Sequence, residues 1–578
     1  MPLVDSTVLA RLVVEARDYA LGAIVRRVVQ PRHDLVALEL SRSGPWSCLV
    51  VDWSAEHGRV HLAAEMPAPG LRDQRLGSTL RRQLRGARLE AIEQVAYDRV
   101  VRLGFSNCEQ LGPQCRRVLI CELTGRHGNA VLVDEDGEII EAGKHVTSRV
   151  NRFRETLPGL DYVPPPQFDR ISPADATPGA LRERAAGAGD EQLGRWLRGG
   201  FHGCSDLFIA EVCQRVGADP ELSLADLPEG WQDAVADHLA AIAREASGPG
   251  ESWVYYDERG ERPELAYPVG LTHLAGRRHE RVESLSAAIE DLHARELARR
   301  EMAGLRERIG AAVRQAETKA QRVLEVRQAA VDRARDAEAD RERGELLMAY
   351  MHQIGPGVDQ VTLPAFDGSG EVTVRLRPEL SALDNARRYF ARYKKAQRLA
   401  KLAPRLLADA RHELEYLGQV RAQVDLAEDA EDLERIEQEL TGEGYLKPRK
   451  RATPPPRRQG PRTITTSDGY ALLYGKSGLE NDDVLRAARA DDLWFHVKGG
   501  PGSHVVLRTN GRPDDVPETS VYEAAQLAAR LSGRRREARV EVDMAPAADV
   551  RKPRGGRPGL AYYHATRTIP VSLATDTP

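Results

Sequence analysis

The chain has 578 residues, of which 41% are hydrophobic and 29% are charged, and its formal net charge is −4. This length exceeds what one hydrophobic core serves and predicts three or four domains. A near-neutral charge argues against a nucleic-acid partner only if the charge is spread evenly. Basic clusters at 447–462 and 550–557 show that it is not. They are typical of phosphate binding, although solvated basic linkers have the same composition.

The six cysteines contain no Cys-x-x-Cys pair, which favours free, partly buried thiols in a reducing compartment over a zinc site. The N-terminal stretch carries no basic region before an apolar run. No segment approaches the roughly 20 apolar residues that span a bilayer. We therefore expect a cytoplasmic protein with no metal, no cofactor and no membrane contact.

Residues 1–170 begin with an amphipathic helical pattern and continue with short strand-like runs, such as DLVALEL and WSCLVVDW, separated by turn residues. A helix is predicted at 76–89, and DEDG at 134–137 reads as a hairpin turn. The pattern predicts an α+β domain with mainly antiparallel strands.

Residues 171–280 begin with a helical pattern. The stretch RWLRGGFHGCSDLFIAEVCQRVGADP predicts a helix, a hairpin and a second helix with Ser205 as its N-cap. Helix-hairpin-helix units present backbone N–H groups to phosphates, but a purely structural helical insert fits the stretch equally well.

Residues 281–445 predict a long coiled coil. Apolar residues recur at spacings of three and four: Met302, Leu305, Ile309, Ala312, Ala316, Ala320 and Val323. A small strand-bearing insert, QVTLPAFDGSGEVTVRL, precedes a second helical run at 381–440, so the helices can fold back as an antiparallel pair. Arms of roughly 60 residues would reach about 90 Å and bridge distant points of a large partner, unless they form a dimerisation rod.

A basic, proline-rich linker at 446–462 leads to a last domain at 463–578, where strand and helix patterns alternate and predict an α/β fold. The stretch DDLWFHVKGGPGSHVVL at 491–507 resembles an active site at first sight. Asp491 and Asp492 are adjacent, so on a strand they point to opposite faces and cannot act as a pair. The two histidines lack a third metal ligand, which leaves catalysis unsupported.

Binding explains this stretch better. Alternation on a strand places Trp494, His496 and Lys498 on one face, opposite Phe495 and Val497. Together with the following turn, this face predicts a base-stacking or phosphate-binding platform. In the plainer alternative, Trp494 packs under a helix. The predicted RNA contacts of this domain are Trp494, His496, Lys498, Gly502, Ser503, His504, Lys552 and Arg554.

Asp98 and Arg99 interrupt the otherwise apolar stretch QVAYDRVVRLGF, which we interpret as a strand. The two side chains either form an internal salt bridge or reach out to nucleotides, for which the planar guanidinium of arginine is suited. The sequence does not distinguish these alternatives.

The order of a β-rich domain and a helical unit resembles formamidopyrimidine-DNA glycosylases, whose N-terminal proline is a nucleophile. This chain begins Met1-Pro2, but Leu3 stands where that family has glutamate, and the family's zinc finger has no counterpart. The resemblance therefore implies a similar N-terminal fold without the chemistry.

Motifs along nearly the whole chain resemble the RqcH family, also called the NFACT or fibronectin-binding-protein-A-like family. They include YDRVVRL, CELTGRHGNAVLVDEDGEII, GFHGCSDLFIAEVCQRVG, DNARRYFARYKKAQR, GEGYLKP and TSDGYALLYGKSGLENDDVL. The turn Gly499-Gly500-Pro501-Gly502 departs from the family pattern by one extra glycine, which puts its fine contacts in doubt. The resemblance implies an NFACT-N domain at 1–170 and an NFACT-R RNA-binding domain at 463–578.

The family resemblance implies a ribosome quality-control factor rather than an enzyme. Such a factor binds the large ribosomal subunit, at rRNA and stalk-base proteins, while peptidyl-tRNA obstructs it. It recruits alanyl-tRNA and supports template-free alanine tailing of the stalled chain for degradation, together with a small RNA-binding cofactor of the ribosome-associated heat-shock type. Asp98 and Arg99 then match the family's tRNA-binding pair, and Asp5 matches a further acidic position. The alternatives are a surface fibronectin-binding adhesin and a nucleic-acid lyase that uses Pro2.

Overall fold

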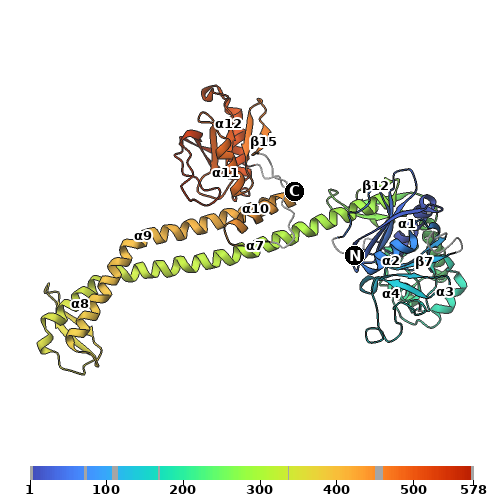
Figure 1. Ribbon diagram of the computed structural model, residues 1–578, viewed down its shortest axis with the longest axis horizontal. Coiled ribbons are helices and arrows are strands. Elements are labelled where there is room, and N and C mark those ends of the chain that lie inside the picture. The colour runs from blue at the N-terminus through green and yellow to red at the C-terminus, as the bar shows by residue number, and fades with distance from the viewer. Residues whose placement is uncertain are drawn as a thin grey trace. The chain divides into compact units, whose positions relative to one another are not determined.

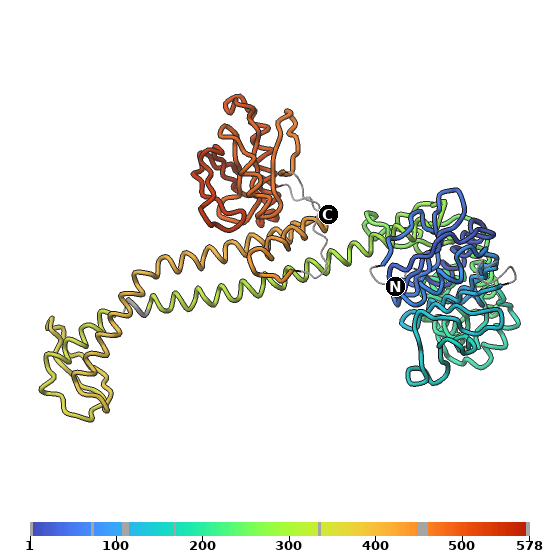
Figure 2. The backbone as a smooth tube through the Cα atoms, viewed as in Figure 1, coloured from blue at the N-terminus to red at the C-terminus, as the bar shows by residue number. Residues whose placement is uncertain are grey.

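The computed structural model describes residues 4–70, 74–106, 115–166, 169–335, 337–448 and 460–573. Pro2, Leu3, Cys108 and most of the predicted basic linker lie outside these residues. The chain divides into two compact units, Met1–Leu297 and Ala298–Pro578, which Figures 1 and 2 trace along the chain.

The first unit begins with two antiparallel sheets. The first sheet has the order β1-β2-β3-β4 and the second the order β5-β6-β7-β8-β9, so neighbours in sequence are neighbours in space. The strands are β1 (Val25–Arg32), β2 (Leu35–Leu40), β3 (Cys48–Asp52), β4 (Arg59–Ala63), β5 (Arg88–Gln94), β6 (Val100–Ser106), β7 (Arg117–Glu122), β8 (Asn129–Val133) and β9 (Ile139–Ala142). This arrangement confirms the predicted antiparallel α+β domain.

Helix α1 (Ser6–Ala20) is the central helix of this unit. Leu9, Leu12 and Ala16 on it are fully buried, in a core that also takes side chains from both sheets. Helix α2 (Arg75–Leu84) packs on β1 and ends five residues before the predicted end, where Gly86 adopts a left-handed backbone.

The helical part of the first unit follows the sheets. It comprises α3 (Pro178–Ala185), α4 (Leu193–Gly200), α5 (Asp206–Val216) and α6 (Trp231–Ala246). The predicted helix-hairpin-helix is confirmed as α4 and α5: the Ser205 hydroxyl accepts a hydrogen bond from the Phe208 amide, and Gly217 ends α5 in the left-handed region. A three-stranded sheet of order β11-β10-β12 was not predicted, although SWVYY carries the aromatic and β-branched residues typical of strands. Its strands are β10 (Ser252–Tyr256), β11 (Pro263–Tyr267) and β12 (His279–Val282).

Long helices dominate the first half of the second unit. They are α7 (Leu285–Arg335), whose first residues belong to the first unit, α8 (Ala337–Ala349), α9 (Ala382–Leu426) and α10 (Ala430–Gly442). The predicted strand-bearing insert is the hairpin of β13 (Gln360–Pro364) and β14 (Glu371–Arg375). Leu305 and Ile309 pack against Leu417 and Val420, so α7 and α9 lie side by side, as Figure 1 shows.

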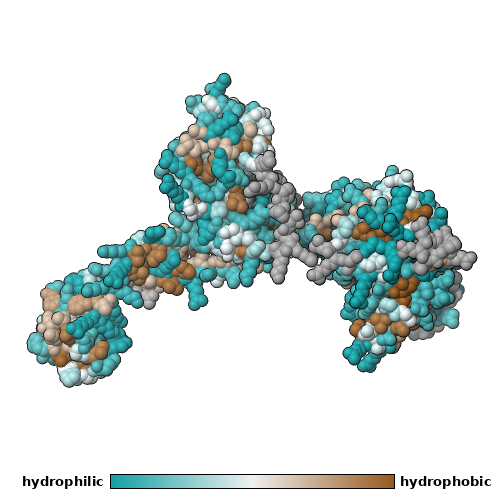
Figure 3. Space-filling model, viewed as in Figure 1, coloured by the Kyte–Doolittle hydropathy of each residue, from teal (hydrophilic) through white to brown (hydrophobic). Residues whose placement is uncertain are grey.

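Three details of the predicted coiled coil are wrong. The second helical run is not continuous, because Asp429 accepts a hydrogen bond from the Asp432 amide and starts α10 as a separate helix. The seam contains the buried Val313 next to the predicted Ala312, and Val323 is largely exposed. The 45 residues of α9 correspond to about 68 Å, shorter than the expected arm. Hydrophobic side chains gather on the visible face of this arm (Figure 3), and Val326 and Leu402 are among the exposed ones.

The C-terminal part of the second unit is a six-stranded sheet of order β15-β16-β18-β17-β19-β20 with helices α11 (Gly478–Ala487) and α12 (Glu518–Arg530). The strands are β15 (Arg462–Thr465), β16 (Ala471–Tyr474), β17 (Leu493–Val497), β18 (Val505–Leu507), β19 (Arg539–Pro546) and β20 (Arg567–Ser572). Every pairing within this sheet is antiparallel, so the predicted α/β class is corrected to α+β.

Candidate nucleic-acid interface

Asp98 and Arg99 lie at a hairpin and not inside a strand. Strand β5 ends at Gln94 and β6 begins at Val100. The Asp98 amide donates to the Val95 carbonyl at 2.8 Å, and the Val95 amide donates to the Val100 carbonyl at 2.9 Å. The prediction of one continuous strand is therefore wrong, because a tight turn reverses the chain here. The turn places both side chains at the end of the sheet instead of on its face.

The backbone of this turn is strained. Its central residues Ala96 and Tyr97 have φ values of 48° and 55°, a region that costs non-glycine residues roughly 1–3 kcal/mol each. Tyr97 offsets this cost through its side chain, which is buried against Phe208 and donates a hydrogen bond to the Thr7 hydroxyl at 3.2 Å. The turn that carries Asp98 and Arg99 is thus anchored from beneath.

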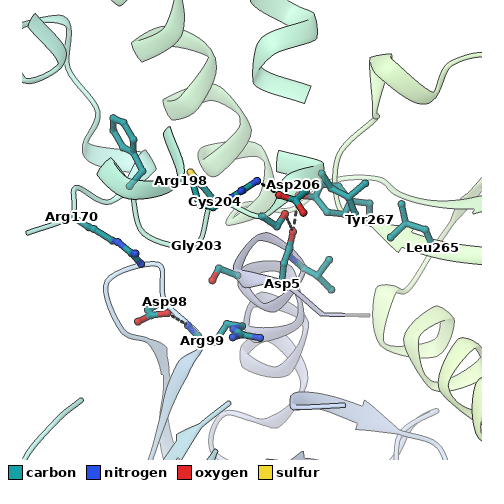
Figure 4. A pocket seen from close by; sticks show the side chains of 15 residues that line it. Asp5, Asp98, Arg99, Arg170, Arg198, Gly203, Cys204, Asp206, Leu265 and Tyr267 are labelled. Carbon is teal, nitrogen blue, oxygen red and sulfur yellow. Dashed lines mark hydrogen bonds and ion pairs between the residues drawn. The ribbon is translucent and has the colours of Figure 1, made fainter. Parts of the chain in front are cut away.

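A pocket of about 340 Å³ opens beside this turn, and Figure 4 shows its lining. It brings together all three residues that the sequence predicts for tRNA binding, Asp5, Asp98 and Arg99. They come from the start of α1 and from the β5–β6 turn. The lining also contains residues that the sequence analysis missed, namely Arg170, Arg198, Asp206 and Tyr267.

The Arg99 side chain is available to a ligand. The Arg99 backbone is fixed, because its amide donates to the Asp98 carboxylate at 2.7 Å and its carbonyl accepts from the Leu123 amide at 2.8 Å. Among the described residues, its guanidinium has neither a hydrogen bond nor an ion pair, and no Asp98–Arg99 side-chain salt bridge forms. Of the two readings left open by the sequence, this geometry favours outward contact.

Two further arginines line the pocket, so that three guanidinium groups stand beside the three carboxylates of its lining. Arg170 lines it from the segment before α3, and Arg198 lines it from α4, where it forms an ion pair with Asp206. Guanidinium groups bind phosphate through paired donors, so three of them around one cavity suit a nucleic-acid backbone. The stretch RGGFHGCSD contained the signal for Arg198, but only the fold brings it near Arg99.

The Asp5 carboxylate connects three elements of the pocket wall by hydrogen bonds. Its carboxylate accepts hydrogen bonds from the Val8 amide at 2.9 Å, from the Ser205 hydroxyl and from the Tyr267 hydroxyl at 3.1 Å. These bonds tie α1 to α5 and β11, while burial raises the pKa of the Asp5 carboxyl above its usual range. Asp5 has a structural function here, and its direct contact with tRNA stays a prediction.

Gly203 permits the close packing between the helix-hairpin-helix and α1. Its φ is 70°, and a Cβ atom there would lie 2.5 Å from the Ser6 Cβ and 2.6 Å from the Tyr97 carbonyl oxygen. Any side chain would push the α4–α5 turn away from the strained hairpin. This glycine therefore positions the two walls of the pocket.

The second predicted site, on β17, is buried. The alternation was interpreted correctly, since Phe495 and Val497 pack in one cluster with α12 and Trp494 packs in another with Val484 and Val506. Both faces of the sheet are covered, however, and Trp494 is only 1% exposed. The prediction of Trp494 as an exposed stacking surface is wrong, because α11 and the segment after β19 cover that face. His496 is partly buried, and its contact with RNA stays a prediction.

The histidines are enclosed with the indole ring. The His496 ring stacks on Trp494 with centroids 5.6 Å apart, and the His504 ring meets Trp494 edge-on at 5.3 Å. Burial lowers the pKa of both imidazoles, and that of His504 lies well below its usual value. The Trp494 and His504 rings are too deeply buried to stack on bases from solvent.

The turn after β17 is also packed inward. Ser503 and His504 are each 2% exposed, and a Cβ atom at Gly502 would lie 2.8 Å from a Val497 methyl group. The predicted RNA contacts of their side chains are therefore corrected to packing within the domain. The absence of a side chain at Gly502 allows the turn to pack closely against Val497.

Three predicted contacts remain at the surface. Lys498 is about half exposed and lies 3.3 Å from the Glu541 carboxylate, Lys552 pairs with Asp482, and Arg554 is exposed. Their positions suit phosphate contacts, which stay a prediction.

The remaining ionisable groups add no metal centre within the described ranges, where no cluster of three or more His, Cys, Asp or Glu side chains is arranged to hold an ion. The five described cysteines are free, as predicted. No described helix combines the length and apolar character needed to cross a bilayer.

Two family models match the chain over most of its length. A family model described as NFACT N-terminal and middle domains matches residues 5–459, and one described as NFACT protein RNA binding domain matches residues 461–558. A solved structure titled as the C-terminal of the fibronectin/fibrinogen-binding protein from Streptococcus suis is 30% identical, with a TM-score of 0.38, and the match covers 48% of this chain and 96% of that one.

Curated relatives match over nearly their whole length. The protein named Rqc2 homolog RqcH from Streptococcus suis is 29% identical over 99% of this chain and 98% of its own. The protein of the same name from Bacillus subtilis is 27% identical over 97% of this chain and 96% of its own. Since the first family model alone spans most of the sequence, the chain belongs to the RqcH (NFACT) family.

Proposed function

We propose that this protein is a ribosome quality-control factor that binds the large ribosomal subunit while peptidyl-tRNA obstructs it. It recruits alanyl-tRNA through the pocket around Asp98 and Arg99 and promotes template-free alanine tailing of the stalled chain for degradation. The C-terminal domain and the helical arm contact rRNA and stalk-base proteins. A small RNA-binding cofactor of the heat-shock type acts with it on the same particle.

The protein acts in this proposal by positioning and not as an enzyme. Peptide bond formation belongs to the ribosome, and a factor that holds an aminoacyl-tRNA in place lowers the entropic cost of the reaction. Its work takes place in the cytoplasm, where stalled ribosomes occur.

One observation carries the proposal. On an anchored turn, the Arg99 guanidinium has no partner within the described part of the chain, and it stands beside a pocket with two further arginines. Family membership and the match to an RNA-binding domain support an RNA ligand. A rigid turn with an available guanidinium is suited to a phosphate or a base edge, because little order has to be imposed on binding.

The test is a double substitution, Asp98→Ala with Arg99→Ala. We expect the variant to co-sediment with large subunits as the wild type does, but to lose co-purifying tRNA and alanine tails on stalled reporter chains. The matched control is Arg26→Ala, since Arg26 is an exposed arginine on β1 outside the pocket lining. Tailing that persisted in the double variant would overturn the site assignment.

A further inference from the structure

Ion pairs join the C-terminal domain to the helical arm at α9 and α10. The Lys476 Nζ atom lies 2.6 Å from the Glu428 carboxylate and 3.3 Å from the Asp432 carboxylate. The Arg462 guanidinium also forms an ion pair with Asp432. Within the described part of the chain, no hydrophobic cluster contains side chains of both the arm and the domain. Polar contacts of this kind resemble transient interfaces, so the domain can leave the arm without exposing a hydrophobic core.

Arg557 makes a second charged contact with the arm. Its guanidinium pairs with Glu413 at 2.5 Å and with Glu443, and it lies 5.4 Å from the centroids of two tyrosine rings of the arm. Arg557 is the last residue of the basic cluster 550–557, whose composition is typical of phosphate binding. In the structure, carboxylates of the arm bind the paired donors that arginine offers to phosphate.

The start of α11 binds a further carboxylate of the arm. Residues 475–478, Gly-Lys-Ser-Gly, connect β16 to α11. The Leu479 amide, in the first turn of α11, donates to the Glu439 carboxylate of α10 at 3.1 Å. A Cβ atom at Gly478 would lie 2.6 Å from the same carboxylate, so the glycine allows its approach. Amides at a helix N-terminus are suited to phosphate, because their N–H groups have no partner within the helix.

These contacts belong to one surface of the C-terminal domain. The Pro558 carbonyl oxygen, next to Arg557, would lie 2.9 Å from the same Cβ position at Gly478, two residues after Lys476. The carboxylates that bind this surface come from α9, α10 and the residues beside α10, and they are Glu413, Glu428, Asp432, Glu439 and Glu443. The arm therefore presents a group of negative charges to the domain, as a nucleic-acid backbone does.

The surface keeps an excess of positive charge without the arm. Its cations are Arg462, Lys476, Lys552 and Arg557. Two carboxylates of the domain lie among them: Glu480 is 3.3 Å from Arg462, and Asp482 pairs with Lys552. On separation, Glu480 loses its contact with Arg435 of α10, which is 3.2 Å long. Four cations, two carboxylates and a helix N-terminus together suit phosphate groups.

We infer that Arg462, Lys476, Arg557 and the start of α11 form a phosphate-binding surface for RNA, which the carboxylates of α9 and α10 cover until RNA displaces them. The arm and the RNA compete for the same donors. The apparent affinity for RNA is therefore reduced by the fraction of molecules in which the domain is free of the arm. The inference rests on the proposed function, since it takes rRNA as the ligand of the C-terminal domain.

A disulfide lock tests this competition. A Cβ atom at Gly533 would lie 3.5 Å from the Ala422 Cβ atom of α9, within the range of about 3.5–4.5 Å found in disulfides. The full-length variant Ala422→Cys with Gly533→Cys is titrated with a large-subunit rRNA transcript before and after reduction. We expect the oxidised form to bind at least about 10-fold more weakly, because the lock keeps the carboxylates on the cations. The wild type with and without reductant is the control for the native cysteines.

A second variant weakens the contact instead of locking it. Glu413→Gln with Glu443→Gln removes both carboxylates from Arg557 and is expected to bind the transcript about 5-fold more tightly than the wild type. The matched control, Glu415→Gln with Glu434→Gln, removes two charges from α9 and α10 that form no ion pair within the described residues. It should change the affinity by less than about 2-fold.

The outcomes separate the inference from the proposed function. If the wild type bound no rRNA, the proposed function would fail and the inference with it. If the oxidised and reduced forms bound rRNA equally, RNA binding would stand and only the competition would be wrong. A non-reducing gel shows whether the disulfide forms. If it does not, the glutamine variants decide, and equal affinities of the two double variants would overturn the inference.

Discussion

The hairpin around Asp98 and the strand at 493–498 have similar residues and opposite environments. Both combine charged or imidazole groups with aromatic ones beside a tight turn. In the hairpin, the aromatic Tyr97 points inward as an anchor, and Arg99 is left at a cavity. In the strand, Trp494 is buried in a hydrophobic cluster with Val484 and Val506. The His496 and His504 rings pack against its indole ring. Aromatic and basic residues in one stretch therefore indicate binding only when the polar groups lie outside the hydrophobic clusters on the two faces of the sheet.

The largest expected effect is on the stability of the C-terminal domain. Trp494→Ala should lower the free energy of unfolding of the C-terminal domain by about 3–5 kcal/mol, since it removes a large, fully buried side chain. Arg99→Ala should change stability by no more than about 0.5 kcal/mol, because its guanidinium supports no internal contact in the described residues. Urea unfolding of the full chain measures both. A Trp494→Ala variant with wild-type stability and weakened RNA binding would show that Trp494 contacts RNA and does not support the fold.

A smaller effect is expected at the hairpin backbone. Ala96→Gly should stabilise the first unit by up to about 1 kcal/mol, because glycine adopts a φ of 48° without a steric cost. Ala91→Gly on β5 is the control, and it should destabilise by roughly 0.5–1 kcal/mol, since strand backbone gains nothing from glycine. Thermal unfolding with both variants gives the difference. Destabilisation by both substitutions to the same extent would show that the turn is not strained.

The smallest effects are expected at the surface cations of the C-terminal domain. Lys498→Ala and Lys552→Ala should each reduce the slope of log affinity for rRNA against log salt by roughly one, as the loss of one phosphate contact does. Lys319→Ala on the exposed side of α7 serves as the control. Titrations of an rRNA fragment at several salt concentrations measure the slope. An unchanged slope in both variants would show that Lys498 and Lys552 do not contact phosphate and that RNA binds to another surface of this domain.

Local patterns predicted much of the fold. The alternation of apolar residues, the capping Ser205 and the insert between the long helices all appear where they were expected, because each depends on neighbours in sequence. The break before α10 and the strands β10–β12 were missed, although Asp429 is a local N-cap signal and SWVYY is a strand-like run. Family motifs pointed to Asp98, Arg99 and Asp5, and the fold brings the three to one pocket.

Sequence alone was sufficient for the strand faces, for the start of α5 after Ser205, and for the family motifs. Only the tertiary structure decided which faces are covered. Alternation assigns Trp494 to one side of β17, but a second buried layer made of α11 and the segment after β19 closes that side. In the same way, Arg170 and Arg198 join Arg99 only because the helix-hairpin-helix packs on α1 through Gly203. Burial and the meeting of distant residues are properties of the packed chain, and local patterns do not carry them.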